Sequence, residues 1–110
     1  MINITCTVQQ GSIPEGIQPK LSDALTDSCK DILGSNQGPV NISWTEVPSG
    51  FGFRGGLPST TSLIRGSIPD GCSTDNRKKL LQRIGKEWSE ITRTDVDECV
   101  VSFRDESWAG

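Results

Sequence analysis

The chain opens with the segment Met1-Ile2-Asn3-Ile4-Thr5-Cys6-Thr7-Val8, on which the prediction of the fold depends. Apolar residues occupy its even positions as far as Val8 and alternate with polar ones, which is the period-two pattern of a half-buried strand. The sequence shows no leader before it, so we expect a strand that begins at the second residue. An α-amine held beside such a strand is a potential base, because its ordinary pKa is about 7.7–8.0.

The composition predicts one domain, residues 1–110, with a single core. The 11 basic and 14 acidic residues give a net charge of −3. The densest basic run, Arg77-Lys78-Lys79, lies in a helical pattern and favours a solvated helix face over a nucleic-acid site. No apolar run approaches the roughly 18 residues of a membrane span, and no secretion signal is present. We therefore expect no nucleic-acid partner, no membrane association and a cytoplasmic location.

Histidine and tyrosine are both absent from the sequence. Their absence removes the commonest metal ligand and the commonest general base. The four cysteines form no C-x-x-C pair and indicate reduced thiols, so we expect neither a disulfide framework nor a metal site. Gly50-x-Gly52-x-x-Gly55 has the spacing of a dinucleotide fingerprint, but Pro58 stands where a helix should begin. That context favours a loop, and we expect no cofactor.

The first half of the chain has the pattern of a β-α-β unit. Apolar residues between 17 and 32 recur at steps of four and three and predict an amphipathic helix, which the polar, glycine-containing segment 34–39 ends. Alternation over residues 40–45 predicts a second strand. A glycine- and proline-rich loop at 48–60 follows it.

The second half repeats this pattern. Residues 63–68 predict a third strand, an apolar stripe over 80–91 predicts a second helix, and 99–103 predict a fourth strand. A shift of 59 residues aligns Leu21 with Leu80 and Trp44 with Phe103. We predict an α+β fold, a β-α-β-β-α-β pseudo-repeat with units at about 1–57 and 58–110. Its two helices would cover one face of a four-stranded sheet, and the other face would require a partner.

The order of several short segments along the chain resembles that of the tautomerase superfamily, which includes MIF-like proteins. The resemblance is strongest to the group around cis-3-chloroacrylic acid dehalogenase. The segments are residues 5–8, Val47-Pro48-Ser49-Gly50, Arg65-Gly66-Ser67-Ile68 through Gly71 and Ser73, Leu80-Leu81, Trp88-Ser89-x-Ile91-Thr92 and Glu106-Ser107-Trp108. The resemblance implies a homotrimer and an active site built on an amino-terminal proline, which acts as general acid or base on small enolic or unsaturated acids. It also implies two arginines that hold the substrate carboxylate, assisted by a histidine, a tyrosine and a glutamate.

The sequence departs from the family at almost every one of these positions. Ile2 replaces the proline, Pro69 and Cys72 replace the arginines, Cys29 replaces the histidine, Ser102 replaces the tyrosine, and Glu106 is the carboxylate nearest the glutamate position. Initiator methionine is normally removed only before a small residue, so we expect Met1 to remain. Its amine would then lie one residue, about 3.3–3.6 Å, beyond the family position. Reacting atoms must approach within about 3–3.5 Å, so this displacement would disable family chemistry.

Three side chains remain as candidates for replacement chemistry. Cys72 precedes the second helix, where unpaired N–H groups favour a thiolate, although a small turn residue would also fit there. Arg54 and Arg65 could hold a carboxylate, or could be solvated or interface arginines. Two functions follow: a tautomerase-fold binding or structural module without proline-dependent catalysis, or an enzyme on small carboxylic acids that uses the terminal amine or Cys72.

Overall fold

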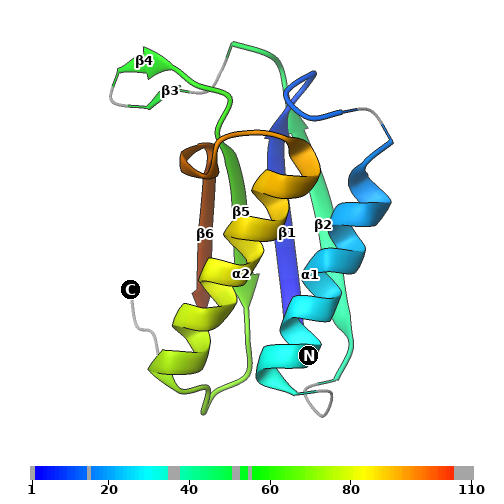
Figure 1. Cartoon of the computed structure of the whole chain (residues 1–110), viewed down its shortest axis with the longest axis vertical. Helices are drawn as coiled ribbons and strands as arrows, with labels where there is room; N and C mark the ends of the chain where they lie inside the picture. Colours follow the sequence, from blue (N-terminus) through cyan, green and yellow to red (C-terminus); the bar gives the residue numbers. More distant parts are fainter. Residues whose placement is uncertain (1, 15, 35–37, 51–52, 55, 106–110) are drawn as a thin grey trace.

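The computed structural model describes residues 2–14, 16–34, 38–50, 53–54 and 56–105. A four-stranded sheet with the strand order β2-β1-β5-β6 forms its centre (Figure 1). Its strands are β1 (Ile2–Gln9), β2 (Val40–Val47), β5 (Ser62–Ser67) and β6 (Cys99–Arg104). The first strand therefore begins at the second residue, as the opening alternation predicts.

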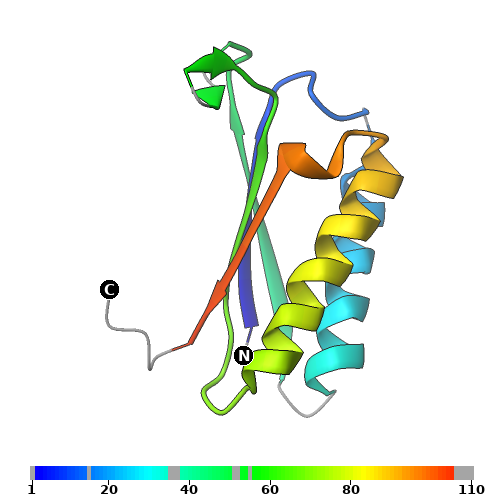
Figure 2. The ribbon, with the colours of Figure 1, turned by 60° about the vertical axis from the view of Figure 1, so that its left-hand side comes forward.

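Strand β1 lies between two neighbours of opposite direction. It pairs parallel with β2 from Ile2 opposite Val40, and antiparallel with β5 from Asn3 opposite Ser67. Strand β5 in turn pairs parallel with β6. Each parallel pair is joined by one crossover helix, α1 (Gln18–Leu33) or α2 (Thr74–Thr92), and both helices lie on the same face of the sheet (Figure 2). The predicted α+β fold class is confirmed.

Local sequence explains where the helices begin and end. Pro19 lies in the first turn of α1, where its missing N–H costs nothing, and Gly34 ends that helix with a positive φ of 93°. At α2, the Ser73 side chain accepts a hydrogen bond from the backbone N–H of Asn76 at 3.1 Å. This N-cap satisfies one of the unpaired donors of the first turn.

The core fills the space between the sheet and the helices. The even positions of β1 are all buried, and they pack against the apolar stripes of both helices. The most deeply buried apolar side chains are Ile2, Ile4, Cys6, Val8, Leu21, Leu25, Cys29, Ile64, Leu80, Ile84 and Trp88. The apolar side chains of the alternating strand pattern and of the two helical stripes therefore pack into one core.

The two aromatic positions that the repeat aligns both point into this core. The rings of Trp44 and Trp88 stack at a centroid distance of 5.8 Å, and the Trp44 indole N–H donates to Ser22 Oγ at 3.4 Å. Phe103 is buried against Gly66 on the neighbouring strand. A Cβ atom on Gly66 would lie only 2.3 Å from Phe103 Cε1. Gly66 is therefore required by the close approach of an aromatic ring.

The connection at 48–60 is not the simple loop that the sequence predicted. It contains two short strands, β3 (Phe53–Arg54) and β4 (Leu57–Pro58). They form a small antiparallel sheet at one end of the molecule (Figure 1). Beyond them, Glu98 in the 3₁₀ turn η2 (Val96–Glu98) accepts hydrogen bonds from Ser59 Oγ at 2.6 Å and Thr61 Oγ1 at 3.0 Å. Two-residue strands carry no periodic signal, so the sequence pattern did not predict them.

We expect Gly66→Ala to lower the free energy of unfolding by about 1–3 kcal/mol, because the added methyl overpacks the Phe103 ring. Gly85→Ala is the matched control: in α2 the nearest atom, Val96 Cγ2, is 3.9 Å from the new Cβ. It should stabilise the protein by about 0.5–1 kcal/mol through helix propensity. Urea unfolding of both variants measures the difference. Equal effects of the two substitutions would contradict the assigned contact.

Candidate functional site

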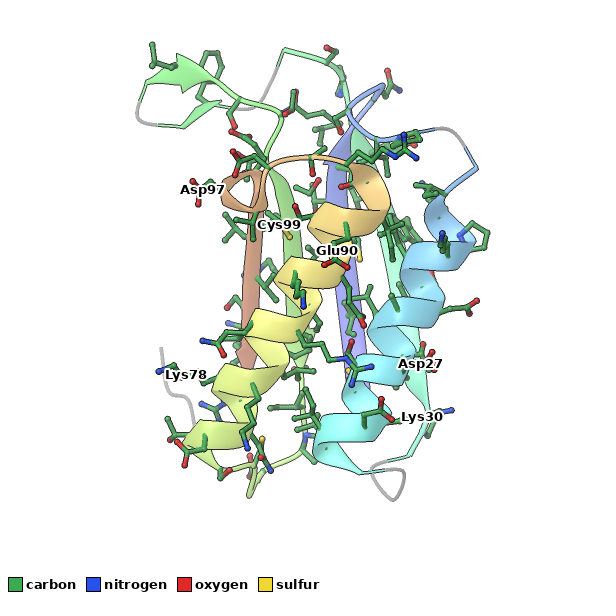
Figure 3. The ribbon with its side chains drawn as sticks, in the orientation of Figure 1. Asp27, Lys30, Lys78, Glu90, Asp97 and Cys99 are labelled. Atoms are coloured by element: carbon green, nitrogen blue, oxygen red, sulfur yellow. The ribbon has the colours of Figure 1, made fainter. Side chains whose placement is uncertain are left out.

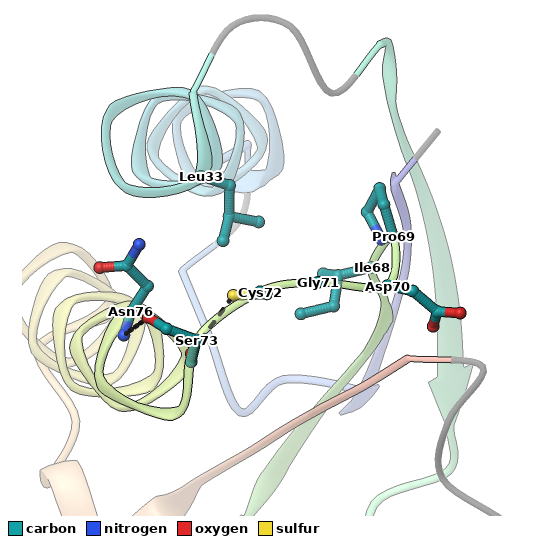
Figure 4. A pocket seen from close by; sticks show the side chains of 8 residues that line it. All are labelled: Leu33, Ile68, Pro69, Asp70, Gly71, Cys72, Ser73 and Asn76. Carbon is teal, nitrogen blue, oxygen red and sulfur yellow. Dashed lines mark hydrogen bonds between the residues drawn. The ribbon is translucent and has the colours of Figure 1, made fainter.

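A pocket of about 220 Å³ lies at the end of the sheet where β1 begins. Asn3 is paired with Ser67, so the chain leaves β5 beside the start of β1 and passes through residues 68–73 into α2. Figure 4 shows the pocket between this segment and the last turn of α1. Its lining residues are Leu33, Ile68, Pro69, Asp70, Gly71, Cys72, Ser73 and Asn76.

Ile2, which we expected at the position of the family's proline, is part of the core. Its side chain is 1% exposed. Its backbone N–H donates to the carbonyl of Pro39 at 3.0 Å, directly before the β1–β2 ladder. The nitrogen at this position is therefore a hydrogen-bond donor within the sheet.

Pro69 and Cys72, which we expected at the positions of the family's arginines, both line the pocket. Cys72 is half-buried, and its Sγ lies 3.5 Å from the carbonyl oxygen of Ser73, a weak contact. The side chain of Asp70 points away from Cys72 (Figure 4). Pro69 and Cys72 bring no cation to the pocket, whose other polar side chains are those of Asp70, Ser73 and Asn76.

Cys29 lies in the core and not in the pocket. It is fully buried on α1, one turn before the pocket residue Leu33. Burial raises the pKa of Cys29 to about 11, and burial together with the neighbouring Cys99 raises the pKa of Cys6 to about 12. Burial also raises the pKa of Cys99 to about 12. These three thiols are protonated at neutral pH and are unsuited to act as nucleophiles.

Arg65 and Ser102 are not brought to this pocket. They are neighbours on β5 and β6, and both are exposed on the sheet face opposite the helices. The cause is the period of a strand: Ile64 points into the core, so Arg65 points the other way. Of the other candidates, Met1 and Glu106 lie outside the described residues, as do the side chain of Arg54 and the tail segment 106–108.

Comparison with solved structures identifies the architecture. The crystal structure of native Ps01740 is 26% identical, with a TM-score of 0.84 and 98% of each chain covered. The symmetric trimer of wild-type fused 4-OT is 17% identical, with a TM-score of 0.84 over 94% of this chain and 84% of that one. N1, a member of the cis-3-chloroacrylic acid dehalogenase family, is 17% identical, with a TM-score of 0.84 over 98% of this chain and 79% of its own.

The chain has the fold of the tautomerase superfamily. The resemblance drawn from the sequence is thereby confirmed at the level of the fold. No family model matches the sequence, and no curated protein matches it. Within the described part of this tautomerase fold, no group of three or more cysteine, aspartate or glutamate side chains is placed to hold a metal ion.

Two pocket residues of this tautomerase fold were not among the sequence candidates. Leu33 closes the pocket from the end of α1, and Asn76 closes it from the first turns of α2. Asn76 lies four residues before Leu80, so it continues the core-facing stripe of α2 with a polar side chain. A polar residue at the end of an apolar stripe was the sequence feature that could have indicated Asn76 as a pocket residue.

We expect the stability of the folded chain to fall between pH 9 and about 11, in part because of Cys29. Its pKa rises from 9.0 in the unfolded chain to about 11 in the fold, so the unfolded chain loses the thiol proton first. The stabilising contribution is complete below pH 9 and is lost as the pH rises through 11. It amounts to roughly 2–3 kcal/mol.

Urea unfolding of wild type and Cys29→Ala, in reductant and at intervals from pH 7 to pH 11, measures this component. The free energy of unfolding of wild type should exceed that of Cys29→Ala by a constant amount up to pH 9, because the difference in this range reflects packing alone. The difference should then shrink above pH 9. Parallel curves over the whole range would exclude the contribution of Cys29.

Proposed function

We propose that this chain is a homotrimeric, tautomerase-fold binding module without proline-dependent catalysis. One observation carries the proposal, the hydrogen bond from the Ile2 N–H to the carbonyl of Pro39. With Met1 ahead of it, that nitrogen is a planar amide whose lone pair is delocalised, so it takes up no proton at neutral pH. The residue that replaces the family's base is thus part of the sheet and its core.

The chemistry around the pocket supports the absence of family catalysis. Pro69 and Cys72 carry no positive charge, so neither can pair with a substrate carboxylate. The volume of about 220 Å³ suits a ligand of few atoms, such as a small carboxylic acid. Such an acid would be held by the backbone N–H groups at the start of α2, not by arginines.

Exposed apolar side chains support assembly into a trimer. Phe53, Leu57, Val96 and Val100 are all between 46% and 70% exposed in the single chain. Such side chains on a small protein favour burial against another surface. The similar fused 4-OT is a trimer, and by analogy we propose three copies of this chain.

The second candidate function is an enzyme that acts on small enolic or unsaturated acids through Cys72 or the terminal amine. The position of Cys72 in the pocket wall favours it, because a ligand in the pocket would lie against this thiol. The described residues offer no histidine to activate it, since the chain has none. We therefore rank the binding module first.

We expect wild type to leave small 2-hydroxy dienoic acids unconverted in a spectrophotometric assay of enol-to-keto conversion, and intact mass to show Met1 retained. Ile2→Pro should expose a secondary amine after removal of Met1 and gain about 10²-fold over the solution rate, the lower end of general acid–base catalysis. Ile2→Ala is the control, because it permits removal of Met1 but exposes only a primary amine.

Native mass spectrometry of the same samples should give the mass of three chains. Clear turnover by wild type that Cys72→Ser abolishes would overturn the first proposal and establish the second. Turnover that is instead lost when the α-amine is blocked would identify the amine as the base.

A further inference from the structure

The short strands β3 and β4 form an arm at one end of the molecule, and two apolar side chains of this arm are exposed. Those of Phe53 and Leu57 are 65% and 70% exposed, the largest fractions among the exposed apolar side chains of the described chain. Phe53 is paired with Pro58, and Arg54 with Leu57. Because successive pairs alternate between the two faces of a sheet, Phe53 and Leu57 lie on opposite faces of the arm. A flat surface would cover one of them, whereas a hollow can bury both.

The base of the arm is fixed by a side chain from the main sheet. Gln9, the last residue of β1, is only 5% exposed. Its Nε2 donates to the carbonyl of Ser59, and its Oε1 accepts from the backbone N–H of Gly50 at 3.4 Å. One buried amide therefore ties both ends of the connection, and Glu98 also holds Ser59 through the hydrogen bond described above. A contact surface that is held in place in advance loses less conformational entropy on binding than a free loop.

A hollow of about 700 Å³ lies at the same end of the molecule, where the chain leaves β1 and turns into α1. Ile13, Pro14 and Pro19 contribute apolar surface to its lining. Figures 1 and 2 both show this connection and the arm on opposite sides of the molecule. The arm therefore reaches away from the hollow of its own chain, and toward the place that a neighbouring copy would occupy.

Arm and hollow have complementary chemistry. Of the described residues that line the hollow, Glu46 alone is charged, and it is acidic. By sequence, residues 53–58 of the arm include one charged residue, Arg54, and it is basic. Opposite charges beside matching apolar surfaces favour one partner and one orientation. Because arm and hollow are different surfaces, contacts between them are heterologous, and such contacts close into a ring when the rotation permits.

We propose that the arm of one copy inserts Phe53 and Leu57 into the hollow of a second copy of this chain. In a ring of three copies, every arm fills one hollow and every hollow receives one arm. The inference rests on the proposed trimer and assigns the two surfaces that hold its copies together. It also gives the connection at 48–60 a role in assembly, which explains why a buried glutamine fixes the base of an exposed arm.

Sedimentation of the full-length protein over a range of concentrations measures the concentration at which half of the chains are dissociated. Leu57→Ser should raise that concentration by about tenfold or more, because association no longer buries a large apolar side chain. Circular dichroism confirms that the variant is folded. An unchanged value for folded Leu57→Ser overturns the arm contact and leaves the trimer standing. A wild type that is monomeric at every concentration overturns the trimer, and this inference with it.

Charge reversal tests whether the hollow is the surface that receives the arm. Glu46→Lys and Arg54→Glu should each weaken association by about tenfold, and the double variant should recover most of the loss, since opposite charges again meet across the contact. Glu90→Lys is the matched control, because it makes the same charge change on the exposed surface of α2 (Figure 3). Alone it should change association by less than about twofold. Failure of Glu46→Lys to rescue Arg54→Glu, or equal rescue by Glu90→Lys, would overturn the proposal.

Discussion

The pairing of β1 with both of its neighbours is the constraint on which the molecule depends. In the described part of the sheet, the two β-α-β units meet at the antiparallel pairing of β1 with β5, and β2 pairs with β1 on its other side. The antiparallel register with β5 sets the segment that enters α2 beside Ile2. The position of the Cys72 pocket therefore follows from backbone hydrogen bonds, and its chemistry follows from the residues that those bonds bring to one end of the sheet.

The same pairing separates two surfaces of contrasting character. Strand alternation directs Ile4 and Ile64 into the core and Thr5 and Arg65 to the opposite side. A slip of one residue would exchange the two sets, so burial of the apolar set also fixes the polar one. The close approach of Phe103 to Gly66 adds a steric constraint to the same register. Core packing and the polar face are consequences of one alignment.

Much of the fold could be predicted from the sequence because its strongest signals are periodic. Alternation in β1 and the apolar stripes of α1 and α2 gave the type and order of the main elements, and the repeat gave the doubled topology. The β3–β4 pair was missed because two-residue strands have no period. Proximity was harder to predict. Leu33 and Cys72 line one pocket because α1 packs beside α2, and no local sequence pattern indicates that residues so far apart in the chain lie close together.

The order of the strands leaves β2 and β6 at the two edges of the sheet, with backbone donors and acceptors unpaired on their outer sides within the described part of the chain. An isolated sheet edge is a template on which another chain can add a strand. A single copy of the chain, with both edges exposed, would therefore be prone to aggregate. If the proposed trimer covers these edges, the stability and solubility of the protein should rise with its own concentration.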